Sequence, residues 1–167
     1  LPWVEKATHL GHELHESGKM EFDASCKRAQ FIDKSLEIRT LFRWAAPTEV
    51  MRALKLYLSS FYGAMLWDLS GEKAGQVYAA WNTAVKLTWE CPRETKTFLL
   101  QNVLSTDMTT ARTDILGRYS KFFCSLKKSA CYEVRVLANL ISRDLRSTTG
   151  RNLKTVRDAS GLDPWYT

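Results

Sequence analysis

Three histidines stand close together near the start of the chain, at positions 9, 12 and 15. Imidazole binds metals and acts as a general base, so this cluster is the first candidate for chemistry. The segment from His12 to Glu16 resembles the zinc motif H-E-x-x-H, whose two histidines are four residues apart on one helical face. Here His15 follows His12 by three, and on a strand His12 would face away from the other two. We therefore expect histidines that face solvent or nucleic acid, and no metal site.

Other catalytic arrangements are missing from the sequence. Two-metal phosphoryl transfer needs paired carboxylates, but no two aspartates are adjacent. Gly71 and Gly75 lack the Lys-Ser/Thr ending of a phosphate-binding loop, and no serine lies in a Gly-x-Ser-x-Gly turn. The cysteines are Cys26, Cys91, Cys124 and Cys131. Their spacing favours reduced thiols in an intracellular protein over disulfides or zinc ligands. We expect no catalytic residue, metal or cofactor in this chain.

Positive charge is concentrated in the last third of the chain. Residues 112–157 contain eleven Lys or Arg and three acidic residues, a net charge of +8, whereas the whole chain carries +6. The remaining residues therefore carry about −2. A concentrated basic segment is the usual footprint of a polyanionic partner, although an ordinary solvated helix surface is the open alternative. Arg135, Arg143 and Arg146 are the candidate nucleic-acid contacts, because they lie off an apolar stripe that we expect to be buried. That stripe is Val134, Leu137, Ala138, Ile141 and Leu145.

A second basic group precedes this segment. Its candidate nucleic-acid contacts are Lys27, Lys34, Arg52 and Lys55. Arg52 and Lys55 are three residues apart and so share a helical face, which is suited to following phosphates without sequence selection. The neighbouring acids Asp33, Glu37 and Glu49 equally fit a helix surface with local ion pairs, and both interpretations stay open.

Apolar periodicity predicts a mainly α protein, a helical bundle with a small N-terminal β hairpin. The hairpin is expected in residues 4–22 with its turn at Ser17-Gly18. Helices are expected over residues 23–42, from Pro47 through Phe61, over residues 77–88 with Trp81 on the apolar face, through residues 115–126 and 134–145, and over residues 152–159. Three parts follow: residues 1–22, residues 23–105 and a basic helical region, 106–167. No run of eighteen apolar residues exists, so no membrane span is expected, and no signal peptide is visible.

The aromatic residues of the middle region lie mostly at helical core spacing. They are Trp44, Tyr57, Phe61, Tyr62, Trp67, Tyr78, Trp81 and Trp89. Because they are interleaved with basic residues they could stack on bases, but a buried stripe is the favoured interpretation. Gly63, next to Tyr62, needs a separate explanation, because a glycine in a helix interior destabilises the helix relative to alanine. We expect it to permit close approach of another backbone or helix.

Several short motifs occur in an order that resembles one protein family. They are His9-Leu10-Gly11-His12, Tyr62-Gly63 before Leu66-Trp67, Trp81-Asn82, Trp89, and Pro92-Arg93-Glu94-Thr95. This order resembles the C-terminal part of non-LTR retrotransposon reverse transcriptases, over about residues 5–105. The resemblance implies that residues 1–22 correspond to the palm–thumb border and residues 23–105 to a helical thumb.

A thumb of that family holds a template–primer duplex. The resemblance therefore implies a non-catalytic, nuclear, nucleic-acid-binding portion whose partner is an RNA–DNA or other duplex. The fingers and the catalytic palm would lie upstream, and the absence of an initiator Met favours a piece of a longer protein. The alternative is a stand-alone helical protein-interaction module derived from such an element, whose basic face is only solvated.

Overall fold

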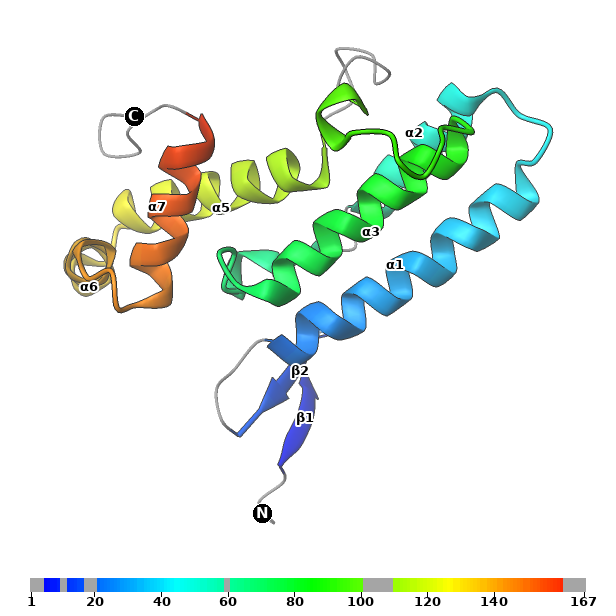
Figure 1. Ribbon diagram of the computed structural model, residues 1–167. Coiled ribbons are helices and arrows are strands. Elements are labelled where there is room, and N and C mark those ends of the chain that lie inside the picture. The colour runs from blue at the N-terminus through cyan, green and yellow to red at the C-terminus, as the bar shows by residue number, and fades with distance from the viewer. Residues whose placement is uncertain (1–4, 10–11, 17–20, 59–60, 101–109, 161–167) are drawn as a thin grey trace.

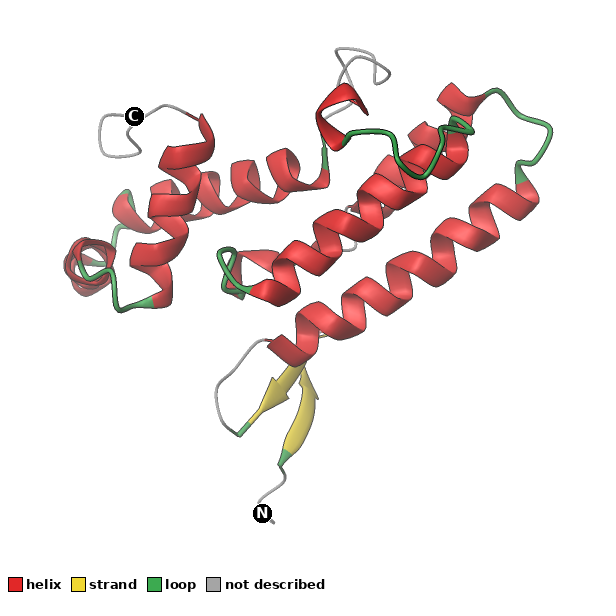
Figure 2. Cartoon of the chain, viewed as in Figure 1, coloured by secondary structure: helices red, strands yellow, loops and turns green. Residues whose placement is uncertain are grey.

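The computed structural model describes residues 5–9, 12–16, 21–58, 61–100 and 110–160, and these are mainly helical (Figure 2). In chain order the elements are β1 (Lys6–His9), β2 (His12–His15), α1 (Glu21–Leu41), α2 (Pro47–Leu58), the 3-10 helix η2 (Ala64–Leu66), α3 (Glu72–Thr88), the 3-10 helix η3 (Thr97–Leu99), α5 (Ala111–Lys127), α6 (Tyr132–Arg143) and α7 (Thr148–Ser160). The mainly α class is as predicted. Within these ranges no helix is long and apolar enough to cross a bilayer.

The two strands pair antiparallel at one end of α1 (Figure 1). Lys6 lies opposite His15, and the Glu16 amide donates to the Glu5 carbonyl at 3.0 Å. The expected turn at residues 17–18 lies outside the described residues. Glu21 and Phe22, which we placed in the hairpin, instead belong to the first turn of α1. The expected pairing about Ser17-Gly18 is therefore wrong: residues 12–15 pair with residues 6–9, and residues 21 and 22 are already helical.

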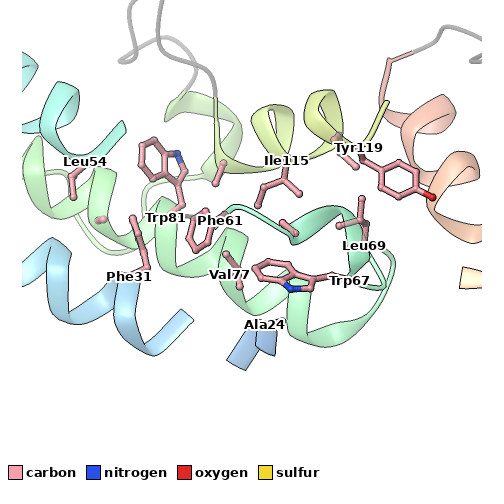
Figure 3. Close-up of a cluster of buried hydrophobic side chains, with 14 of the residues drawn as sticks. Ala24, Phe31, Leu54, Phe61, Trp67, Leu69, Val77, Trp81, Ile115 and Tyr119 are labelled. Atoms are coloured by element: carbon pink, nitrogen blue, oxygen red, sulfur yellow. The ribbon is translucent and has the colours of Figure 1, made fainter. Parts of the chain in front are cut away.

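One buried cluster joins the helices, and aromatic rings form its centre (Figure 3). The ring centroid of Phe31 lies 5.7 Å from that of Phe61 and 5.9 Å from that of Trp81. Phe61 in turn meets Trp67 edge-on at 6.0 Å. Offset and edge-to-face contacts of this kind stabilise beyond the area that they bury. The rings come from α1, α3 and the segment between α2 and α3, so the cluster fixes all three together.

The buried face of α3 is the predicted one. Val77, Trp81, Ala84, Val85 and Thr88 are all buried. The sequence spacing of Ala29, Ile32 and Leu36 predicts that they form the buried face of α1. This prediction is wrong, because the buried residues of the helix are Asp23, Ala24, Phe31, Ser35 and Ile38. Apolar residues occur around most of α1, so two stripes compete in its sequence. The stripe through Phe31 meets the aromatic cluster, which leaves Leu36 half exposed beside α3.

α2 does not continue through Phe61, contrary to the prediction. α2 ends at Leu58, and Phe61 is buried in the connection that follows. Gly63 has φ 88°, a left-handed conformation that glycine adopts without steric cost, and it caps η2. This glycine therefore makes a turn, and the close approach of another backbone that we expect at this position stays a prediction. The turn brings Phe61 and Trp67 onto the same core.

The last three helices pack on one another and on the rest of the core. α5 contacts α3 and η2, and α6 and α7 pack against α5 (Figure 1). The buried cluster contains residues from both sides of the expected boundary at residue 105, which itself lies outside the described residues. α7 begins at Thr148, four residues earlier than predicted. A Cβ on Gly150 would lie 2.2 Å from the Asp144 carbonyl oxygen, so a glycine there allows α7 to start against the preceding loop.

Candidate nucleic-acid interface

The candidate cations of α1 and α2 differ in their surroundings. Lys34 Nζ lies 2.6 Å from Glu37 Oε2, and this hydrogen bond holds the Lys34 pKa above its usual 10.5. Arg52 Nη1 lies 2.7 Å from Glu49 Oε1. Both pairs are exposed and lie within a single helix, so they contribute little to stability. They match the alternative interpretation of this surface, in which local carboxylates already compensate the cations.

The other two candidates of this group are half buried. Lys27 lies on α1 seven residues before Lys34, and therefore on the same face of that helix. Lys55 lies in the last turn of α2. α1 and α2 pack together, but in the described part of the chain no contact between Lys27 and Lys55 joins these cations into one site. That either lysine binds phosphate stays a prediction.

The three candidate arginines of the last third are not equivalent. The guanidinium of Arg135 donates to the carbonyls of Ser129 and Ala130 at 2.6 and 3.0 Å, and it lies over the Tyr132 ring. It therefore fastens the α5–α6 connection. Arg146 contacts Asp144 at 3.2 Å, but its side chain is 94% exposed. Arg143 is exposed at the end of α6.

The stripe expected to be buried on α6 is wrong in part. Ala138 and Ser142 are the buried residues of this helix. Leu137 and Leu145 are 57% and 58% exposed, and Leu140 is 64% exposed. α6 packs against α5 and α7, and the two residues that it buries have small side chains. Much of its apolar surface therefore faces solvent.

Several cations of residues 112–157 are exposed and take part in no ion pair within the described ranges. They are Arg112, Lys121, Lys128, Arg143 and Lys154, and only Arg143 was among the sequence candidates. Four of them lie on α5, α6 and α7, and Lys128 caps the C-terminus of α5. By contrast, Arg118 is held by Asp114 at 2.7 Å and Arg151 by Asp68 at 2.6 Å. Single cations at the ends and on the outer faces of helices give no local signal in the sequence. The net charge of the segment was therefore predicted, but these positions, apart from Arg143, were not predicted one by one.

A buried polar network positions α7. The Asn152 side chain is 1% exposed; its Oδ1 accepts from the Leu69 amide at 2.8 Å and its Nδ2 donates to the Trp67 carbonyl at 2.7 Å. The Trp67 indole N–H donates to the Asp23 carboxylate at 2.7 Å. These bonds connect α1, the η2 region and α7. Each of these side chains therefore has a hydrogen-bond partner, which offsets the cost of burying it.

An ion pair reinforces this network at the surface. Arg151 Nη2 contacts Asp68 Oδ2, and the Ser70 amide and hydroxyl donate to the other carboxylate oxygen. Partial burial acts to raise the Asp68 pKa, but the hydrogen bonds from Ser70 and Arg151 outweigh it and hold the pKa below 3.8. Arg151 is thus a structural cation, and α7 presents Lys154 from a firmly held helix.

The connection between α1 and α2 holds residues that sequence reasoning placed wrongly. Trp44, expected in the core, is 87% exposed. Beside it, Arg39 and Arg43 line a hollow together with Trp89. In the sequence, Arg43-Trp44 lies directly after a predicted helix and shortly before Pro47. Connections between helices mostly face solvent, so this position could have indicated an exposed tryptophan.

No group of three or more His, Cys, Asp or Glu that could hold a metal is found in the described part of the chain. His9 and His15, which we expect to face solvent or nucleic acid, are the last residues of β1 and β2. Compared with family models, curated proteins and solved structures, the chain finds no match. The functional proposal therefore rests on the exposed cations of residues 112–157, which we call the basic surface: Arg112, Lys121, Lys128, Arg143 and Lys154.

Proposed function

We propose that this chain binds the phosphate backbone of a nucleic-acid duplex with little sequence preference. The observation that carries the proposal is the net charge of +8 in residues 112–157, with five exposed cations on α5, α6 and α7 and at the C-terminal cap of α5. Lysine and arginine contacts to phosphates fix a protein on a duplex without selecting sequence. The motif order supports a finer proposal, that the chain is the thumb and post-thumb portion of a non-LTR retrotransposon reverse transcriptase, acting on an RNA–DNA duplex in the nucleus.

The salt dependence of binding tests this proposal quantitatively. Each phosphate contact contributes about −0.9 to the slope of log affinity against log salt. Arg112, Lys121, Lys128, Arg143 and Lys154 together therefore predict a slope of about −4 to −5. A steeper slope would mean that arginines now in ion pairs also reach phosphates. Fluorescence anisotropy on a blunt RNA–DNA duplex at several salt concentrations measures it.

The variant for this test must avoid the structural arginines. Replacing Arg135 would release the α5–α6 connection, so we choose Lys121→Glu, Arg143→Glu and Lys154→Glu, one exposed residue from each helix. We expect most duplex binding to be lost and the melting temperature to stay near that of the parent, because exposed charge changes rarely cost much stability.

A matched control reverses three cations outside the basic segment, Lys73, Arg93 and Lys96. It has the same change in net charge and should keep most of the affinity. Equal losses of duplex affinity in both triple variants would mean that net charge alone determines binding. If the parent protein binds no duplex even at low salt, the proposal is refuted. Because the chain has no paired aspartates, we also expect no primer extension by the purified protein with Mg²⁺ and nucleotides.

The exposed apolar face of α6 favours a second candidate, a helical protein-interaction module. Tyr132, Leu137 and Leu140 are each more than half exposed on this helix. Contiguous apolar surface of this kind often marks an interface. A Leu137→Asp, Leu140→Asp variant separates the candidates: duplex binding should survive it if the basic surface acts alone. The protein-interaction module would be favoured if the parent self-associates by light scattering, the variant does not, and the parent binds no duplex.

A further inference from the structure

The connection between α1 and α2 presents an aromatic ring and a guanidinium to solvent. Trp44 is the most exposed large apolar side chain of the described residues, at 87%. The guanidinium carbon of Arg43 lies 4.8 Å from the centroid of its ring. Indole is among the most costly side chains to leave in water, so an exposed tryptophan calls for a reason. A base or another planar group would cover this ring by stacking.

A hollow of about 480 Å³ is lined by Arg43 of this pair and by the following Ala45, whereas Trp44 itself does not line it. Arg39, Phe42 and Arg43 line one side of it, and Thr88, Trp89 and Glu90 belong to the other. Its volume is in the range of small-ligand sites. Two guanidinium groups at one hollow favour a phosphate or carboxylate, because each can donate two parallel hydrogen bonds to such a group.

Helix ends account for part of this arrangement. Arg39 Nη2 donates to the Leu87 carbonyl at 3.3 Å, and a cation is favoured at the C-terminus of α3. Glu90 lies in the left-handed region because it follows the end of α3, where the Cys91 amide donates to the Lys86 carbonyl at 2.8 Å. Neither contact explains the exposure of Trp44 or the placement of Arg43 over its ring.

We propose that Trp44, Arg43 and this hollow bind an unpaired nucleotide of a nucleic-acid strand. The base stacks on the indole, while Arg43 and Arg39 contact its phosphate, and the carboxylate of Glu90 limits the affinity. Stacking is available to any base, so the site is tolerant of sequence. A paired base inside a duplex has no free face, so the ligand is single-stranded. The inference rests on the proposed function for the class of partner, nucleic acid.

This site and the basic surface of the last helices lie far apart. In Figure 1 the α1–α2 connection is at the right edge of the molecule, and α6 and α7 are at the left. A substitution at Trp44 should therefore leave contacts made by α5, α6 and α7 intact. This separation allows the two sites to be tested independently on one protein.

Anisotropy with a labelled 20-nucleotide single strand, and with the blunt duplex of the same sequence, tests the inference. Trp44→Ala should weaken single-strand binding by about 5- to 150-fold, the effect of losing one stacking contact. Trp44→Phe should restore most of it, whereas Trp44→Leu, which keeps apolar area without a ring, should not. Arg43→Ala should reduce the single-strand salt slope by about 0.7. Glu90→Gln should raise the affinity by about 1.5- to fivefold.

Phe98→Ala is the matched control, since Phe98 is another exposed aromatic (68%) outside this hollow, and it should change nothing. Blunt-duplex affinity should be the same for Trp44→Ala and the parent. Single-strand binding that is indifferent to Trp44→Ala, or equal losses on strand and duplex, would overturn the inference while leaving the proposed duplex function standing. Trp44-dependent strand binding without duplex binding would uphold the inference and refute the duplex proposal. Binding to neither ligand would overturn both.

Discussion

Asn152 is the residue whose replacement tests most directly how the last helix is held. Asn152→Ala removes hydrogen bonds of 2.8 and 2.7 Å and leaves the Leu69 amide and the Trp67 carbonyl buried without their side-chain partner. Each buried group left unsatisfied costs about 1–3 kcal/mol, so we expect a loss of about 2–6 kcal/mol in the free energy of unfolding. For a chain of this length that lowers the melting temperature by roughly 5–20 °C. Urea unfolding followed by far-UV circular dichroism measures the free energy.

A second variant at the same site identifies the hydrogen bond as the cause. Asn152→Asp keeps an acceptor for the Leu69 amide but places a carboxylate against the Trp67 carbonyl. Only the protonated acid can donate there, so burial and the missing donor raise its pKa in the folded state. The destabilisation should therefore be small at pH 4 and grow as the pH rises toward 7.

Lys154→Ala is the control for both variants, because this residue is exposed on the same helix. Its unfolding free energy should stay within about 0.5 kcal/mol of the parent. If Asn152→Ala unfolds at the same urea concentration as Lys154→Ala, the network does not hold α7 and the account given of it is wrong.

Four further substitutions test other parts of the fold. Trp81→Ala should cost about 3–5 kcal/mol by urea unfolding, since it empties the centre of the aromatic cluster, and melting like the parent would contradict the buried assignment. Glu90→Gly should raise the melting temperature, with a gain of about 1 kcal/mol, because glycine adopts φ 50° without strain. Gly150→Ala should lower it, because the added carbon meets the Asp144 carbonyl. The folded-state pKa of Asp68 is depressed, so its stabilisation is complete above pH 4 and is lost as the pH falls through that pKa; Asp68→Asn should flatten this dependence in acid unfolding curves.

Periodicity predicted those faces where one apolar stripe dominates. On α3 the large residues Val77, Trp81 and Val85 share one stripe, and the structure buries them. On α1 the apolar residues lie around the helix, and the packing of Phe31 against Phe61 and Trp81 selects the face. That choice depends on partners 30 and 50 residues away in sequence, which local spacing cannot reveal.

The same limit applies to the polar residues. The sequence shows that residues 112–157 are basic, but it cannot separate a guanidinium that fastens a loop from one that faces solvent. Arg135 was chosen for its position off an apolar stripe, yet backbone carbonyls of the preceding connection hold it. Asn152 carried no signal at all, because its partners precede it by more than 80 residues. Trp44 was assigned to the core by residue type alone, and only the tertiary structure shows that no helix covers it.

The stability of the fold and the proposed duplex binding meet at α7. Asn152, Leu153 and Val156 face inward, so that Lys154 points outward from a helix held at a fixed position. A cation on a fixed helix meets a phosphate without the entropic cost of ordering that helix on binding. Weakening the network should therefore reduce duplex affinity although no charge has changed. Asn152→Ala, studied at a temperature where it is folded, should bind the blunt duplex less tightly than the parent but with nearly the same salt slope. An unchanged affinity would mean that α7 contributes nothing to the basic surface, and that α5 and α6 alone carry it.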